Sequence, residues 1–186
     1  MPESGATHEP PWWNPANALT LLRVALVPVI AAVLIVDAPT GRWWAFGIFV
    51  FAALTDSIDG WVARKLIGVT RWGQLADPAA DKVLIVGSLA VLAYLDRLPW
   101  WAVAVIVVRE IAVTLQRQAL LQRDVVMPAS LFGKAKTVSQ VVAVTAYLLP
   151  GAPQYLRLGL LWLALALTVV SGLEYAWRGR GLRRES

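Results

Sequence analysis

The sequence has no cysteine and only one histidine among its 186 residues. Without cysteine there are no disulfides and no thiol chemistry, and the redox compartment stays undetermined. The single histidine, His8, lies in a polar, proline-containing N-terminal stretch, where we expect neither a catalytic nor a metal-binding role. A zinc site, which favours His and Cys ligands, is therefore not expected.

Charged residues are also scarce. They make up 16% of the chain, whereas 58% is hydrophobic and ten residues are tryptophan. The length predicts one domain, and the apolar content indicates a membrane protein. Against this background the net charge of +5 does not indicate nucleic-acid binding, because basic residues beside membrane helices set orientation and attract anionic lipid. The first 17 residues lack Lys and Arg, so we expect no cleavable signal peptide.

Six apolar stretches approach the length of about 20 residues that a membrane-crossing helix needs. None shows strand-like alternation, so the expected fold is an all-α integral membrane protein with six transmembrane helices. The stretches cover residues 18–36, 43–63, 81–98, 99–120, 136–150 and 155–177. We expect residues 1–16 to form a flexible tail, residues 17–178 the membrane domain, and residues 179–186 a basic tail.

Basic residues are distributed unevenly between the two sides that six spans would create. Both termini and the connections around residues 64–80 and 121–135 share one side, which holds twelve Lys and Arg against three on the other. The positive-inside rule makes the basic side cytoplasmic. Tryptophans at residues 12–13, 43–44, 100–101 and 177 lie near span ends, as interfacial anchors do.

Four aspartates stand out in the segment that follows the second span. Asp56 and Asp59 are three residues apart on the expected second helix, and Asp77 and Asp81 are four apart, so each pair shares a helix face. Pro78 predicts that Asp77 is the N-cap of the third helix. Capping is an alternative explanation for Asp77 and Asp81. It does not explain Asp56 and Asp59, which lie towards a helix C-terminus, where the dipole disfavours anions.

The free-energy cost of placing these carboxylates in a membrane favours a bound cation that neutralises them. Each costs about 2.5–3.5 kcal/mol deep in a membrane, and Arg64 can relieve only one of them. Hard oxygen ligands suit Mg²⁺ or Mn²⁺, and a pair of such ions about 3.5–4 Å apart clamps a phosphoryl group. Gly60 leaves space for a ligand near the backbone, and Arg64 lies one turn further on. The segment therefore predicts a pyrophosphate site.

The same segment resembles the signature of the CDP-alcohol phosphotransferases, in which four Asp, two Gly and an Ala-Arg pair recur at fixed spacings. Every spacing of that signature is kept here by Asp56, Asp59–Gly60, Ala63–Arg64, Gly73, Asp77 and Asp81. The resemblance extends over nearly the whole chain. It implies a six-helix membrane enzyme, a homodimer, a CDP-diacylglycerol donor, and two Mg²⁺ per site, with Mn²⁺ as the alternative.

The resemblance also implies roles for individual residues. The metal ligands are Asp56, Asp59, Asp77 and Asp81. Asp81 also serves as the general base that activates the acceptor hydroxyl for attack on the β-phosphorus, with CMP as leaving group. The residues that contact CDP-diacylglycerol are Asn17, Thr20, Gly60, Arg64, Thr70 and Gly73.

Basic residues further along the chain indicate an anionic acceptor. Arg109 lies inside the fourth span, and Lys134 and Lys136 lie near the start of the fifth, so together they can bind a phosphate. A structural Arg109–Glu110 pair and ordinary positive-inside charge are the alternatives. Short patches resemble the bacterial phosphatidylglycerophosphate synthase branch of the family: NALTLLRVALVP (17–28), ADPAADKVL (76–84), REI (109–111), MPAS (127–130) and GKAKT (133–137).

This branch joins CDP-diacylglycerol to sn-glycerol 3-phosphate, and the resemblance to it implies a bacterial inner membrane. The bias of basic residues predicts that the aspartate segment opens to the cytoplasm. Within the family, a cardiolipin synthase or an enzyme that uses inositol phosphate is an alternative. Outside it, the alternative is a divalent-cation transporter with aspartates along an ion path. All four aspartates lie towards one side, which disfavours such a path. If the aspartates had a purely structural role, the Asp81→Asn variant would retain its activity.

Overall fold

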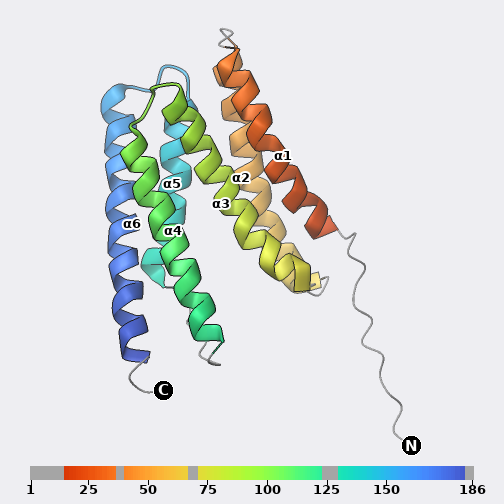
Figure 1. The fold of residues 1–186 in the computed structure, drawn as a ribbon. Helices are drawn as coiled ribbons and strands as arrows, with labels where there is room; N and C mark the ends of the chain where they lie inside the picture. The colour runs from red at the N-terminus through yellow and green to blue at the C-terminus, as the bar shows by residue number, and fades with distance from the viewer. Residues whose placement is uncertain (1–14, 37–39, 67–70, 123–129, 183–186) are drawn as a thin grey trace, which may run out of the picture.

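The structure is a computed structural model that describes residues 15–36, 40–66, 71–122 and 130–182. Side chains are described at residues 21–36, 40–55, 82–122 and 130–179. These parts of the chain contain six helices and no strand, so the all-α prediction is confirmed (Figure 1). The helices are α1 (Pro15–Ile35), α2 (Gly41–Leu66), α3 (Arg71–Tyr94), α4 (Trp100–Leu121), α5 (Leu131–Leu148) and α6 (Gln154–Leu182).

Helix α3 differs most from the sequence prediction. It begins at Arg71 rather than near Asp81, so Asp77 lies inside the helix and Pro78 is not its first residue. The prediction of an N-cap at Asp77 was wrong. A proline removes only one backbone donor, and neighbouring helices can compensate for it in a tightly packed bundle. Helix α1 likewise continues through Pro28.

The fifth helix also begins earlier than predicted. It starts at Leu131 rather than at Lys136, and Ser130 is its N-cap, with Oγ accepting a hydrogen bond from the Gly133 N–H at 2.9 Å. This bond satisfies one of the backbone donors that the first turn of a helix leaves free. Lys136 therefore lies in the second turn of α5, inside the bundle rather than at its rim.

The six helices form two groups of three that pack along a shared core. Helices α1, α2 and α3 lie on one side of the bundle and α4, α5 and α6 on the other (Figure 1). Between the two groups, α3 contacts α4 and α5, and α2 contacts α5. Gly87 lets α1 and α3 approach closely, since a Cβ there would lie 2.6 Å from Val27 Cγ1. Each helix contributes to the main core: Leu34, Phe49, Leu92, Ile106, Leu148 and Leu161 are examples.

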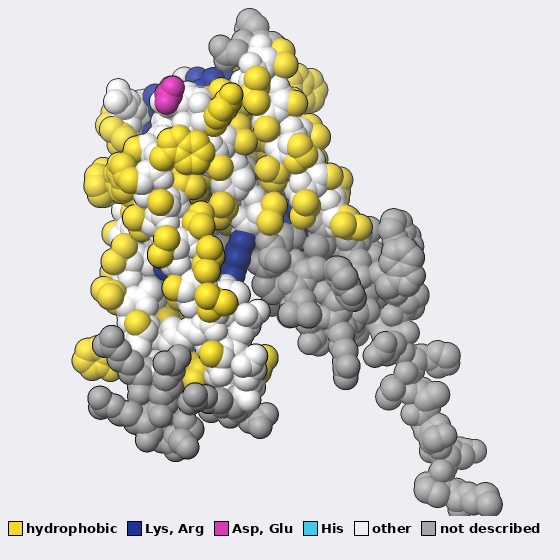
Figure 2. Space-filling model, viewed as in Figure 1, with side chains coloured by type: hydrophobic (Ala, Val, Ile, Leu, Met, Phe, Trp, Pro, Cys, Tyr) yellow, Lys and Arg dark blue, Asp and Glu magenta, His cyan; other side chains and the backbone are white. Residues whose placement is uncertain are grey.

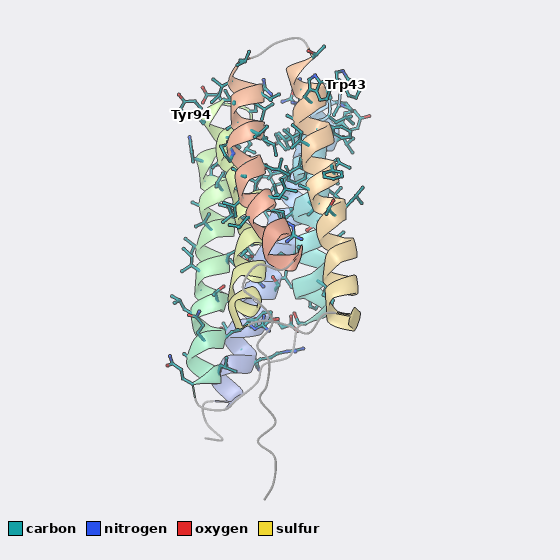
Figure 3. All side chains as sticks on the ribbon, turned by 90° about the vertical axis from the view of Figure 1, so that its right-hand side faces the viewer. Trp43 and Tyr94 are labelled. Carbon is teal, nitrogen blue, oxygen red and sulfur yellow. The ribbon has the colours of Figure 1, made fainter. Side chains whose placement is uncertain are left out.

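Large hydrophobic side chains also cover much of the outer surface (Figure 2). Trp43 and Tyr94 lie at the same end of the bundle, and both are more than half exposed (Figure 3). Among the described residues, one helical segment, Gln154–Gly179, is long and apolar enough to be a candidate membrane span. Shorter apolar helical segments run over Leu21–Ile35, Gly41–Thr55 and Lys82–Tyr94.

Arginines tie the helices together at the end of the bundle where α2 begins. Arg42 Nη2 donates to the backbone carbonyls of Tyr147 at 3.3 Å and Leu149 at 3.4 Å. A cation near the last carbonyls of a helix is favoured by the helix dipole. The Arg157 guanidinium lies over the Tyr147 ring, 5.9 Å from its centroid. These contacts fix α2 and α6 to the end of α5.

Candidate functional site

The four aspartates of the signature lie on two consecutive helices. The backbone is helical at Asp56 and Asp59 in α2 and at Asp77 and Asp81 in α3. Their side chains lie outside those that the structure describes. The same holds for the expected donor contacts on α1, α2 and α3, which are Asn17, Thr20, Gly60, Arg64 and Gly73; Thr70 lies outside the described residues altogether.

The backbone nevertheless places the two pairs of aspartates at matching depths. Helix α2 ends at Leu66 and α3 begins at Arg71, and the two helices run in opposite directions (Figure 1). Five Cα steps span at most about 18 Å, so these two ends are near neighbours. At 1.5 Å per residue, Asp59 and Asp77 lie roughly 9–11 Å from those ends, and Asp56 and Asp81 roughly 15 Å.

This arrangement fits the donor set that the sequence predicts for a metal site. Two aspartates on each of two antiparallel helices, at two matched levels, would supply the hard oxygen ligands that Mg²⁺ and Mn²⁺ prefer. Among the described side chains, no group of three or more His, Cys, Asp or Glu residues converges elsewhere. The metal ligands stay a prediction for Asp56, Asp59, Asp77 and Asp81.

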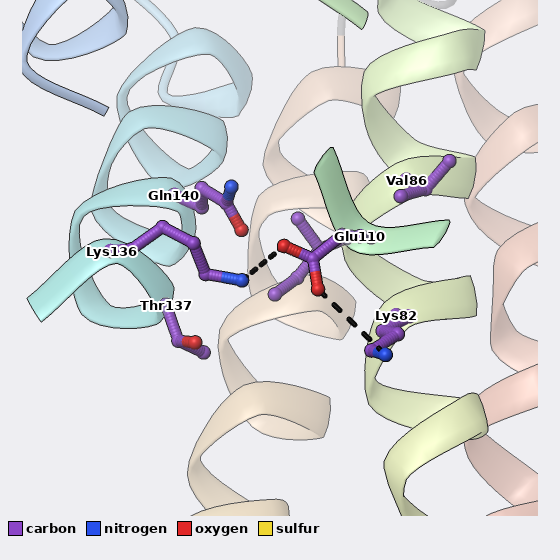
Figure 4. A pocket seen from close by; sticks show the side chains of 7 residues that line it. Lys82, Val86, Glu110, Lys136, Thr137 and Gln140 are labelled. Carbon is purple, nitrogen blue, oxygen red and sulfur yellow. Dashed lines mark hydrogen bonds and ion pairs between the residues drawn. The ribbon is translucent and has the colours of Figure 1, made fainter. Parts of the chain in front are cut away.

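A cavity with charged residues in its wall opens on the part of α3 that follows Asp81. Its volume is about 150 Å³, and it lies between α3, α4 and α5 (Figure 4). Lys82, the residue after Asp81, is part of its wall. The lining residues are Lys82, Ile85, Val86, Glu110, Lys136, Thr137 and Gln140.

Glu110 is the centre of the charged groups around this cavity. Its buried carboxylate forms an ion pair with Lys136, which is itself 5% exposed, and a second pair with Arg109 Nη1 at 3.1 Å. Lys82 Nζ lies 3.8 Å from the other carboxylate oxygen and also donates to the Thr114 hydroxyl. Figure 4 shows the two lysines approaching Glu110 from α5 and α3.

The charges of this cluster do not balance. Three cations surround one carboxylate, which leaves an excess of two positive charges within the described residues. Arg109 Nε and Nη2 form one edge of the guanidinium, and both are buried without a hydrogen-bond partner among the described groups. A buried guanidinium edge with free donors and a local cationic excess are suited to an anion such as a phosphate monoester.

The three basic residues expected to bind the acceptor have different environments. Lys136 lines the cavity, and Arg109 shares the Glu110 carboxylate oxygen with it without lining the cavity itself. Lys134 is exposed and is not part of the cavity wall, because residues two apart on a helix point to different sides. The Arg109–Glu110 pair, one of the alternatives, is present.

Sequence reasoning missed three residues of the cavity wall that carry polar groups, Lys82, Thr137 and Gln140. Lys82 counted only as one of many basic residues, although its place directly after Asp81 was a usable signal. Gln140 lies one turn after Lys136 on the same face of α5, and its amide donates to the Thr168 hydroxyl at 3.0 Å. Both Gln140 and Thr168 are buried, so this bond joins α5 to α6 behind the cavity.

Comparison with known proteins shows the family of this chain and several of its relatives. The family model described as "CDP-alcohol phosphatidyltransferase" matches residues 13–170. A Mycobacterium tuberculosis protein named "Probable phosphatidylglycerophosphate synthase" is 40% identical over 170 residues, covering 89% of this chain and 81% of the relative. A Bacillus subtilis protein named "CDP-diacylglycerol--glycerol-3-phosphate 3-phosphatidyltransferase" is 38% identical over 181 residues, covering 88% and 93%. A Rickettsia bellii protein of the same name is 34% identical over 172 residues, covering 87% and 93%.

Proposed function

The chain belongs to the CDP-alcohol phosphatidyltransferase family, and we propose that it transfers the phosphatidyl group of CDP-diacylglycerol to sn-glycerol 3-phosphate. The products are phosphatidylglycerophosphate and CMP, so the enzyme serves phosphatidylglycerol synthesis. The names of relatives at 34–40% identity support this reaction. The observation that carries the choice of acceptor is the cation-rich cavity beside Asp81, which suits a small phosphorylated alcohol.

The donor headgroup would lie at the four aspartates. Members of the family generally use divalent metals, and Asp56, Asp59, Asp77 and Asp81 would hold two Mg²⁺, with Mn²⁺ as a substitute. When bound, these ions would neutralise charge on the pyrophosphate and on the departing CMP oxygen. The residues proposed to contact the CDP-diacylglycerol headgroup are Asn17, Thr20, Gly60, Arg64, Thr70 and Gly73.

The acceptor would enter from the cavity side. Lys136, supported by Arg109, would hold its phosphate through charge-assisted hydrogen bonds, and exposed Lys134 would attract it from solvent. The glycerol hydroxyl would then face Asp81, which precedes the cavity residue Lys82 on α3. Holding both reactants in this orientation supplies much of the rate enhancement in such a transfer.

Asp81 would act as the general base of the transfer. It takes the proton from the acceptor hydroxyl, whose oxygen forms the new bond to the β-phosphorus. The bond between the β-phosphorus and the oxygen that bridges to the α-phosphate breaks, and CMP leaves with the electron pair. The position of Asp81 on α3, directly before Lys82 in the wall of the cationic cavity, supports this role.

The family is membrane-associated, and we propose that all six helices of this chain cross a bacterial inner membrane. Exposed hydrophobic side chains on the helices and tryptophans at the starts of α2 and α4 support this placement. The bias of basic residues towards one side supports cytoplasmic termini and a cytoplasmic active site. By its family, the enzyme would be a homodimer.

A CMP-release assay with a panel of acceptors tests this function. Purified protein with CDP-diacylglycerol should release CMP with sn-glycerol 3-phosphate, and a chelator should abolish release until Mg²⁺ is restored. Asp81→Asn should remove turnover and keep the thermal unfolding midpoint of the parent. Incorporation of phosphatidylglycerol or inositol phosphate in place of glycerol 3-phosphate would contradict the proposal.

A further inference from the structure

Tyr175 on α6 joins three segments of the chain that meet behind the cationic cavity. It is 4% exposed, and the Arg109 guanidinium lies over its ring, 5.5 Å from the centroid. Its hydroxyl accepts a hydrogen bond from the Ser130 N–H at 3.2 Å. Its backbone carbonyl accepts one from Gln116 Nε2 at 2.8 Å. Each contact links α6 to a residue of α4 or to the start of α5.

Helix α6 is also shaped to receive the Arg109 side chain. At Gly172, about one turn before Tyr175, an added Cβ would lie 3.2 Å from Arg109 Cγ. A larger residue would therefore push the arginine stem away from its present path. Val113 and Leu120 of α4 pack with Tyr175 in a small apolar cluster. The Arg109 side chain is thus clamped between α4 and α6.

Two sets of contacts connect Tyr175 with Lys136. Arg109 binds the Glu110 carboxylate, and the same carboxylate oxygen binds Lys136. Ser130, held by the Tyr175 hydroxyl, is the N-cap of α5 and sets the start of the helix that carries Lys136. Tyr175 therefore influences both the partner of Lys136 and the helix on which Lys136 lies.

We propose that Tyr175 is a positioning residue for the acceptor: its buried ring holds Arg109, and its hydroxyl anchors the start of α5, so that Lys136 is correctly placed. The proposal rests on the proposed function. It assigns no contact between Tyr175 and a substrate. Because the effect passes through the acceptor side of the site, the change must appear in acceptor binding and not in donor binding.

Two substitutions of Tyr175 separate the effect of its ring on the acceptor KM from the effect of its hydroxyl. Tyr175→Leu removes the cation–π contact and should raise KM for sn-glycerol 3-phosphate roughly tenfold, with KM for CDP-diacylglycerol unchanged. Tyr175→Phe keeps the ring and should raise the acceptor KM by about threefold or less, since one neutral hydrogen bond is lost. In an Arg109→Gln background, Tyr175→Leu should raise the acceptor KM by no more than Tyr175→Phe does, because only the hydroxyl contact with Ser130 is left to lose.

Tyr147→Leu is the matched control. Tyr147 is 2% exposed and also lies beneath an arginine, Arg157, but at the opposite end of α5 from the cavity. Its loss should destabilise the protein comparably and leave the acceptor KM unchanged. An equal rise of the acceptor KM in Tyr147→Leu would show that Tyr175→Leu acts by general loosening, and this would overturn the proposal.

A binding measurement separates this proposal from the reaction itself. Sn-glycerol 3-phosphate and inorganic phosphate should each raise the thermal unfolding midpoint of the parent, and less so that of Tyr175→Leu. If the parent releases no CMP, the proposed function fails, and these midpoint shifts alone decide the role of Tyr175. Absence of any shift in the parent, or equal shifts in both proteins, would overturn the positioning role.

Discussion

The ion pairs of Glu110 give the sharpest test of how the cavity is held together. Glu110→Gln keeps the size of the side chain and one acceptor oxygen but removes the negative charge. Lys136 and Arg109 are both about nine-tenths buried, so their charges would remain in the bundle without a counter-ion among the described residues. At 3.1 Å and an effective dielectric constant of about 20, the attraction between Glu110 and Arg109 alone is about 5 kcal/mol.

Part of that attraction is offset because the carboxylate itself no longer has to be desolvated. Removing one partner of a buried pair typically costs 3–5 kcal/mol, and the amide retains a hydrogen bond, so we expect a loss of about 3 kcal/mol. For a chain of this length, that loss lowers the unfolding midpoint by about 6–12 °C. Thermal unfolding in one fixed detergent, with and without the substitution, measures it.

A double variant shows whether the loss comes from an uncompensated cation. Glu110→Gln with Lys136→Met should regain about 1–2 kcal/mol, since one buried charge is removed. Glu174→Gln is the control, because Glu174 pairs with Arg178, whose side chain is 48% exposed, and such pairs contribute about 1 kcal/mol or less. Strictly additive effects in the double variant, or a midpoint change no larger than that of Glu174→Gln, would refute the reasoning.

Two further predictions concern the same region. Lys136→Met should raise KM for sn-glycerol 3-phosphate at least tenfold, and Lys134→Met about threefold or less, because Lys136 lines the cavity and Lys134 does not. Acceptor KM values of the two variants check this, and equal effects would contradict it. Thr168→Val should cost about 1–3 kcal/mol, because it leaves the buried Gln140 amide without its partner. Adding Gln140→Leu should restore most of that loss in thermal unfolding, and a further drop would count against a paired role.

The sequence was sufficient to predict the six helices and the resemblance to the family. Apolar stretches located all six helices, because a backbone surrounded by apolar side chains must satisfy its own hydrogen bonds. The spacings of Asp56, Asp59, Asp77 and Asp81 resemble the signature of the family, and the match of the family model confirms that resemblance. Rules for helix ends were less reliable: Pro78 suggested a helix start, whereas α3 already begins at Arg71.

The partners across helices were decided only by the tertiary structure. Periodicity shows which side of a helix is apolar, but in a mostly apolar chain it does not show which helices meet. Glu110 is 26 residues from Lys136 and 28 from Lys82 along the chain, and Tyr175 is far from Arg109 and Ser130. The sequence by itself therefore determined the helices and the carboxylate signature. Packing of α3, α4, α5 and α6 decided which charges share a cavity, because only the fold brings residues so distant in sequence within ion-pairing distance.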